Sequence, residues 1–389
     1  MPVKDKYSTD NQKIVIFGAG RIGRSFIGQL FSRAGFEVVF LDINNNLVKE
    51  INRQGKYEVV HRSNEGDEVI TITNVRGISM NDRQHAVNEL AVADIAAISV
   101  GQHGFPDTIP VIADALILRR KLLGDEPLDF IIAENMRNAD QYMRNELCKL
   151  LPGDYPPDKL VGLVETSIGK MVPIISHKAL EELPLRVYAE PYNTLILSAR
   201  GFKNPIPEMP DLEPKENIKA WVDCKIFIHN LGHAAAAYLG FRKLPDAVFI
   251  HEVLEDPEIF ESTRMTMLQS ADILLTLYPG EFDKPFLEAH IDDLLRRFRN
   301  VPLGDTVFRV GCDLYRKLSP DDRMAAPIRA AIALNMPYSL ILNALLAAIS
   351  FRAKDENGEY FPADLNFFSE AQLGQSHILR NICRLDFLI

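Results

Sequence analysis

A short apolar run, three glycines and a helical stretch follow one another near the start of the chain. Lys13–Phe17 predicts a buried strand and Ile22–Ala34 predicts a helix. Gly18, Gly20 and Gly23 stand at their junction in the spacing G-x-G-x-x-G. This spacing suits a tight turn in which bare backbone approaches an anion and the helix N-terminus offers it free N–H groups. The junction therefore predicts one strand-turn-helix unit of a parallel sheet.

An acidic residue closes the next predicted strand. Asp42 follows Glu37–Leu41, about 20 residues beyond the glycines. A carboxylate there accepts hydrogen bonds from the ribose hydroxyls of an adenosine and repels a 2′-phosphate, so we expect NAD rather than NADP. The alternative is that the glycines form only a turn and that Asp42 only caps the following helix. The cofactor-binding residues expected in this segment are Gly18, Gly20, Arg21, Ile22, Gly23 and Asp42.

Runs rich in β-formers alternate with helical stretches through the first half of the chain. This alternation predicts a doubly wound, mainly parallel sheet of the Rossmann type. Two β-like runs within Tyr57–Ile78, around the turn signal at residues 64–66, predict a hairpin insertion. The remaining strands are expected at Asp94–Val100, Asp129–Ala133, Leu160–Val164, Leu185–Ala189 and Thr194–Ser198.

Small residues close one of these strands. The run Ser99–Gln102 stands where a parallel sheet presents loops to its ligand, so Gly101 is expected beside the nicotinamide half of the cofactor. An ordinary strand-to-helix turn would use the same residue types.

Strand signals nearly vanish after the proline-rich stretch Gly201–Pro214. We therefore predict two domains, a NAD-binding domain over residues 1–200 and an all-α substrate domain over residues 201–389, because 389 residues exceed what one core usually organises. The expected helices are Lys225–Leu239, Pro257–Leu277, Phe286–Phe298, Asp321–Leu334 and Ser339–Phe351.

Composition excludes several classes of partner and site. A net charge of -10 disfavours nucleic acid, which requires an excess of Lys and Arg. No apolar run reaches the ~20 residues that span a bilayer and the first residues are polar, so we expect a cytoplasmic protein without a membrane partner. The four cysteines are far apart and form no C-x-x-C pair, as is typical of reduced thiols.

One predicted helix carries a base and two hydrogen-bond donors. On an α-helix Lys225, Asn230 and His233 spread over an arc of about 140°, so all three can reach one cavity. Oxidation of a secondary alcohol needs a base for the hydroxyl proton and donors for the developing alkoxide. A Lys among apolar neighbours has a lowered pKa and can act as that base. The alternative, which is commoner for such spacing, is an amphipathic helix with a solvated Lys and a core His.

A metal site is a second alternative for the same helix. His229 and His233 stand four residues apart and could share a zinc ion. No acidic residue lies between them and no thiolate cluster is evident, so we expect no metal.

Ordered blocks along the chain, from Lys13 to about Asp386, resemble the polyol-specific long-chain dehydrogenases, the mannitol dehydrogenase family. The resemblance is greatest to the mannitol-1-phosphate 5-dehydrogenase branch. The matching blocks are Phe17–Gly28, Ala133–Met136, Val164–Pro173, Lys225–His233, Arg297–Pro302 and Arg309–Arg323.

The resemblance implies a Rossmann-type domain, a helical substrate domain and metal-independent, NAD-dependent oxidation. It assigns the general base to Lys225 and alkoxide stabilisation to Asn230 and His233. It also places Asn135 near the reacting carbon and the cofactor, and it gives substrate oxygens to Arg309 and Lys317.

The substrate implied by this branch is mannitol 1-phosphate, interconverted with fructose 6-phosphate. The alternative is an unphosphorylated polyol or an aldonate. A phosphate needs several cations, for which Arg316, Lys317 and Arg323 are candidates, although these charges could instead pair with nearby acids on a solvated face.

The chain departs from the family pattern at one place. Gly169 and Lys170 stand where most members have Asp and Arg, and loss of that carboxylate is expected to alter which hydroxyls are recognised. Beyond a small-molecule substrate we expect no partner, and a monomer or weak homo-oligomer. A hypothesis from another class is a nucleotide-binding regulator without catalysis, against which Lys225, Asn230 and His233 argue.

Overall fold

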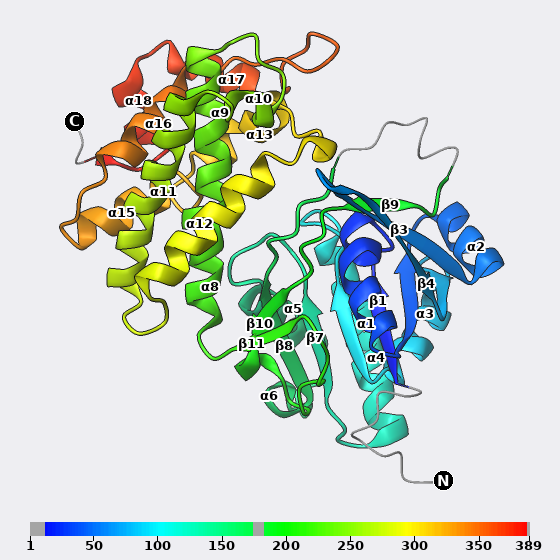
Figure 1. The fold of residues 1–389 in the computed structure, drawn as a ribbon. Helices are drawn as coiled ribbons and strands as arrows, with labels where there is room; N and C mark the ends of the chain where they lie inside the picture. The colour runs from blue at the N-terminus through cyan, green and yellow to red at the C-terminus, as the bar shows by residue number, and fades with distance from the viewer. Residues whose placement is uncertain (1–11, 174–182, 387–389) are drawn as a thin grey trace. The chain divides into compact units, whose positions relative to one another are not determined.

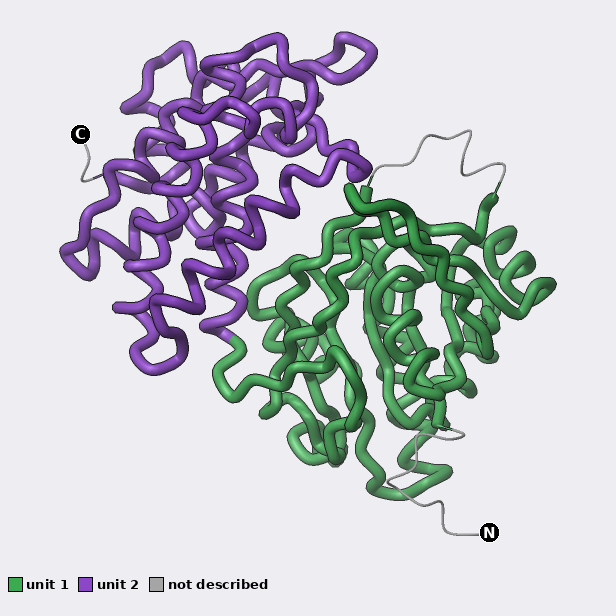
Figure 2. Tube along the Cα trace, viewed as in Figure 1, with its two compact units in different colours: residues 1–218 green, residues 219–389 purple. Residues whose placement is uncertain are grey.

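A computed structural model describes residues 12–173 and 183–386. The chain divides into two compact units, Met1–Ile218 and Lys219–Ile389, which Figure 2 shows in different colours. The first unit extends past the boundary expected near residue 200 because Leu212–Lys215 forms an edge strand of its sheet.

An eight-stranded sheet forms the centre of the first unit (Figure 1). Its order is β11-β10-β8-β7-β6-β1-β2-β5, and neighbouring strands are parallel except β8 and β10. The order reverses at β1, with β2 on one side and β6 on the other, which creates the crevice where such sheets bind ligands. The strands are β1 (Lys13–Phe17), β2 (Glu37–Asp42), β5 (Val75–Ser79), β6 (Ile95–Ile98), β7 (Leu128–Ile132), β8 (Val161–Ser167), β10 (Leu195–Ser198) and β11 (Leu212–Lys215).

Helices cover both faces of this sheet. Alternate residues of a strand face opposite sides, so Ile14 and Ile16 pack in one apolar cluster while Val15 and Phe17 pack in the other. The first cluster contains residues of η1 (Gly23–Gly28), α1 (Gln29–Arg33) and α2 (Asn45–Gln54). The second contains residues of α3 (Arg83–Ala91), α4 (Phe105–Leu123), α5 (Ala139–Leu150) and α6 (Pro157–Leu160), while η2 (Ala199–Gly201) follows β10. The predicted doubly wound architecture is confirmed.

A smaller sheet lies beside the first of these clusters. Its strands are β3 (Lys56–Ser63), β4 (Gly66–Thr73) and β9 (Val187–Ala189). β3 and β4 pair as an antiparallel hairpin, as predicted, whereas β5 leaves the hairpin for the edge of the large sheet. β9 pairs in parallel with β3, so the predicted strand Leu185–Ala189 belongs to the small sheet.

The second unit is helical, and its described residues contain no strand, which confirms the predicted all-α class. Helix α9 is buried along most of its length and packs against α10, α11, α13 and α16. No described helix of the chain combines the length and apolarity needed to cross a bilayer. The helices are α8 (Ile218–Cys224), η3 (Lys225–Asn230), α9 (Leu231–Lys243), α10 (Ile250–Val253), α11 (Pro257–Leu277), α12 (Lys284–Phe298), η4 (Val301–Leu303), α13 (Val307–Gly311), α14 (Leu314–Lys317), α15 (Ala325–Ala333), α16 (Ser339–Ile349), α17 (Asp364–Ala371) and α18 (Gln375–Asn381).

Candidate active site

The three glycines of the turn after β1 have different environments. Gly18 has a φ of +91°, and a Cβ there would lie 2.6 Å from the Ser99 carbonyl oxygen. A Cβ at Gly23 would lie 2.0 Å from the Gly18 oxygen, so helix and turn pack against each other only because both residues lack a side chain. A Cβ at Gly20 would meet nothing within 4 Å. Gly20 therefore leaves open the space that a pyrophosphate needs to approach the backbone.

Two side chains hold the peptide groups of Ala19 inside this turn. The Ala19 N–H donates to Asp42 Oδ2 at 2.7 Å, and the Ala19 carbonyl accepts from Arg24 Nε at 2.7 Å. The side chain that caps α2 is Asn44, which accepts from two backbone N–H groups, so Asp42 is not that cap. Two other predicted cofactor residues of this segment make contacts elsewhere in the protein. Arg21 donates a hydrogen bond to the Pro173 carbonyl, and Ile22 packs at the edge of the apolar cluster that contains Ile14 and Ile16.

If Asp42 accepts hydrogen bonds from the ribose as predicted, Asp42→Ala is expected to weaken NAD binding about tenfold or more, because a charge-assisted hydrogen bond would be lost. The same change should reduce discrimination against NADP, since no carboxylate then repels the 2′-phosphate. Fluorescence titration with NADH and NADPH measures both effects. An unchanged ratio of the two affinities would remove Asp42 from cofactor selection.

The loops after β6 and β7 meet beside the glycine turn. Gln102 Nε2 donates to the Asn135 carbonyl at 2.5 Å. This hydrogen bond connects the loop that contains Gly101 to the loop that contains Asn135, and both residues were predicted to contact the cofactor. Glu134 Oε1 accepts the N–H groups of Val100 and Gly101 at 2.8 and 2.9 Å. Burial raises the pKa of Glu134 to about 6, against the effect of these two hydrogen bonds, so the group is ionised at neutral pH. Glu134 was not among the predicted site residues, although it lies inside the block Ala133–Met136.

The catalytic residues expected in the second unit lie on one continuous helical stretch. Lys225–Asn230 forms a π-helical segment, η3, between α8 and α9. A π turn bonds residues five apart, which sets Lys225 and Asn230 one turn from each other, and such segments are frequent at functional sites. Burial, followed by the repulsion of Arg323, lowers the pKa of Lys225 to about 8.

His233 occupies the next turn of the same helix. Its ring stacks on Phe298 with centroids 4.5 Å apart. Nε2 is buried 3.3 Å from Asp305 Oδ2 but makes no well-aligned hydrogen bond with a described residue. Burial lowers the pKa of His233 despite the opposing Asp305 carboxylate, so the imidazole is neutral at neutral pH. A neutral ring suits a donor to an alkoxide, because one of its nitrogens carries a proton.

Asp305 links His233 to a predicted substrate residue. Arg309 Nη1 donates to Asp305 Oδ1 at 2.5 Å. Although burial opposes it, the neighbouring His233 and Arg309 lower the pKa of Asp305. Asp305 was not among the predicted site residues, and the signal that points to it is its spacing of four residues from Arg309 at the start of a helix.

The remaining predicted cations have protein partners. Lys317 is buried and donates to the Val310 carbonyl at 2.7 Å, and burial followed by Arg323 lowers its pKa to about 7. Arg316 pairs with Asp313 at 2.5 Å and with Asp322 at 3.4 Å, and Arg323 pairs with Asp322 at 2.8 Å. The carboxylate pairing raised as the alternative for Arg316 and Arg323 is therefore present in the structure.

The departure from the family pattern lies in the first unit. The Lys170 side chain is buried, donates to Asn193 Oδ1 at 2.9 Å and lies 5.4 Å from the centre of the Phe26 ring. Lys170 is therefore held among residues of the first unit.

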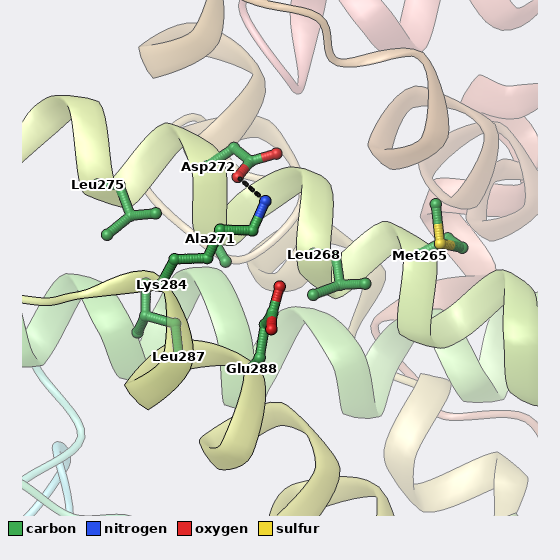
Figure 3. A pocket seen from close by; sticks show the side chains of 8 residues that line it. All are labelled: Met265, Leu268, Ala271, Asp272, Leu275, Lys284, Leu287 and Glu288. Carbon is green, nitrogen blue, oxygen red and sulfur yellow. Dashed lines mark ion pairs between the residues drawn. The ribbon is translucent and has the colours of Figure 1, made fainter.

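Within the ranges that the structure describes, neither a metal cluster nor the pocket of the second unit involves the predicted site residues. Among the described residues no group of three or more His, Cys, Asp or Glu could hold a metal ion. Between α11 and α12 a pocket brings Lys284 Nζ within 3.8 Å of Asp272 Oδ1, and it includes none of the predicted site residues (Figure 3). Its lining is Met265, Leu268, Ala271, Asp272, Leu275, Lys284, Leu287 and Glu288.

Comparison with protein families accounts for both units. Residues 12–211 match the family model described as the mannitol dehydrogenase Rossmann domain, and residues 217–380 match the mannitol dehydrogenase C-terminal domain. The chain belongs to the mannitol dehydrogenase family. The resemblance inferred from the sequence is thus confirmed at the level of the family.

Solved structures have the same fold as this mannitol dehydrogenase family member. Pseudomonas fluorescens mannitol 2-dehydrogenase, in a ternary complex with NAD and D-mannitol, is 18% identical with a TM-score of 0.72, over 92% of this chain and 84% of that one. A D-sorbitol dehydrogenase in substrate-free form is 17% identical with a TM-score of 0.73, over 97% and 87%. At this identity the likeness establishes the fold alone.

Proposed function

We propose that this protein is an NAD-dependent dehydrogenase that oxidises a secondary hydroxyl of an open-chain polyol or polyol phosphate. The observation that carries the proposal is Lys225, a half-buried amine with a pKa near 8 on the same helical stretch as Asn230 and His233. Family membership and the open space at Gly20 support the cofactor assignment. The cytoplasmic location and the absence of a strong oligomer stay predictions from the sequence.

Gly18, Gly20, Gly23 and Asp42 would hold NAD, which accepts a hydride when bound. The neutral Lys225 Nζ takes the hydroxyl proton, and its burial keeps a useful fraction unprotonated near neutral pH. Asn230 and His233 donate hydrogen bonds to the oxygen as negative charge develops there. Arg309 and Lys317 are the proposed contacts to the other substrate oxygens.

The pH dependence of the reaction follows from Lys225. Alcohol oxidation needs the neutral amine, so kcat/KM should rise with pH and level off above about 8. Ketone reduction needs the ammonium, so its kcat/KM should fall above the same pH. Steady-state rates in both directions measure this, and a flat profile from about one unit below to about one unit above that pKa would contradict the assignment.

Metal independence is a separate prediction. Incubation with a chelator such as EDTA should leave turnover unchanged, because the proposed proton acceptor is an amine and no Lewis acid is assigned a role. Inhibition that zinc reverses would instead support a metal bound through His229 and His233.

The identity of the polyol has two candidates. The sequence resemblance favours mannitol 1-phosphate and fructose 6-phosphate. The pairing of Arg316 and Arg323 with Asp322 favours an unphosphorylated polyol, because these cations already have counter-charges. Comparing kcat/KM for fructose 6-phosphate and fructose with NADH decides between them. Turnover of fructose alone would reject the phosphate substrate, and turnover of neither would reject both mannitol and mannitol 1-phosphate as substrates.

A further inference from the structure

Glu134 is a buried carboxylate whose charge has no evident counterpart. The residue is 8% exposed, and Oε1 accepts hydrogen bonds from the N–H groups of Val100 and Gly101. In the described part of the chain, no cation pairs with it and no donor reaches Oε2. Oε2 is not one of the fully buried atoms without a partner, so it is an acceptor that a ligand donor can reach.

The place of Glu134 in the sheet indicates which ligand group that is. A dinucleotide lies across the carboxyl edge of such a sheet where the strand order reverses. Asp42, at the end of β2, marks the adenosine side of β1. The nicotinamide half then falls on the other side, over the ends of β6 and β7. Glu134 follows β7, and the loop that it holds follows β6.

The same loop touches the glycine turn. The missing Cβ of Gly18 gives room to the Ser99 carbonyl, and Ser99 Oγ donates to the oxygens of Phe17 and Gly18 at 3.1 and 3.2 Å. Residues 99–101 therefore join Glu134 to the turn that would hold the pyrophosphate.

We propose that Glu134 positions the nicotinamide half of the cofactor, with Oε1 holding the Val100–Gly101 loop and Oε2 accepting a hydrogen bond from the nicotinamide nucleoside. The donor is the carboxamide N–H or a ribose hydroxyl, both of which are neutral donors to a carboxylate. The oxidised nicotinamide ring carries a positive charge, which the carboxylate also stabilises. The inference rests on the proposed function because it takes NAD as the ligand.

Glu134→Gln tests the second oxygen separately from the first. The Gln oxygen still accepts the two backbone N–H groups, while an amide NH2 donor replaces the acceptor Oε2. Affinity for NAD should fall about tenfold or more, and affinity for ADP, which lacks the nicotinamide nucleoside, should stay as in the unmodified protein. ADP-ribose separates the two donors, since its affinity falls only if the donor is the ribose.

Asp129→Asn is the matched control. Asp129 is a buried carboxylate at the amino end of the same strand, where it accepts the N–H groups of Lys203 and Asn204 at 2.8 and 3.1 Å. Because Asp129 lies at the amino end of β7, whereas the glycine turn lies at the carboxyl edge of the sheet, its substitution should leave NAD affinity unchanged. Isothermal calorimetry with NAD, ADP-ribose and ADP provides the comparison.

Two outcomes would overturn the role of Glu134. If Glu134→Gln binds NAD as tightly as the unmodified protein, Oε2 contacts no cofactor group. If the affinities of the Glu134→Gln variant for NAD and for ADP fall equally, the role of Glu134 is only to hold the loop that packs against the glycine turn. Failure of the unmodified protein to bind NAD contradicts the proposed function itself, so the two proposals fail separately.

Discussion

Lys225→Ala is expected to lower the turnover number about 10³-fold while NADH binding is retained. General acid-base groups contribute factors of about 10² to 10⁴, and Lys225 is the amine of its helix that burial brings to a pKa near 8. The cofactor residues are on the first unit, so the substitution leaves the glycine turn and Asp42 intact. Stopped-flow turnover and NADH fluorescence measure the two effects.

Lys219→Ala provides the control for this substitution. Lys219 is an exposed lysine on α8, six residues before Lys225, and removing it changes the net charge equally while the half-buried Lys225 stays in place. Turnover by this variant should match that of the unmodified protein. Full activity of Lys225→Ala, or equal losses in both variants, would remove Lys225 from the reaction.

Gly23→Ala is expected to abolish measurable NAD binding and to lower the melting temperature of the protein by several degrees. The added Cβ would stand 2.0 Å from the Gly18 oxygen and 2.9 Å from Ser99 Oγ, so the turn and its helix must separate. Overpacking of this kind lowers the free energy of unfolding by about 1–3 kcal/mol. In a unit of this size, each kcal/mol lowers the melting temperature by roughly 2–4 °C. Calorimetry and NADH titration report the two losses.

Substitutions at two other glycines distinguish an effect on protein stability from an effect on NAD binding. Gly20→Ala meets no atom within 4 Å, so it should keep the melting temperature and still weaken NAD binding by filling the space before the turn. Gly153→Ala also meets no atom and lies far from the turn in sequence, so it should change neither property. Normal NAD affinity in both Gly20→Ala and Gly23→Ala would refute a cofactor role for this turn.

The parts of the fold that the sequence predicts are those set by local pattern. The buried part of β1, Ile14–Phe17, is apolar throughout, and α11 has both the periodicity and the capping Asp256 of a regular helix. Edge strand β11 was missed because Glu213 and Pro214 give it no strand signal, and only its pairing with β10 makes it one.

The least predictable features depend on contacts distant in sequence. The π segment at Lys225–Asn230 was missed because apolar periodicity was judged against a regular α-helix. Glu134 was missed because its importance depends on N–H groups of a loop 34 residues earlier. An acidic residue after a strand has the same sequence pattern whether it is solvated or buried. The partners of Arg316 and Arg323, by contrast, are near neighbours in the chain, and this pairing was foreseen as an alternative.

Chemical rescue of Lys225→Ala tests the assignment of the base most directly. Small primary amines such as methylamine, added to this variant with NAD and a polyol that the unmodified protein oxidises, should restore turnover in proportion to the concentration of neutral amine. The restored rate should therefore rise with pH as the added amine loses its proton. A variant that remains inactive at every amine concentration, although it still binds NADH and stays folded, would contradict Lys225 as the proton acceptor.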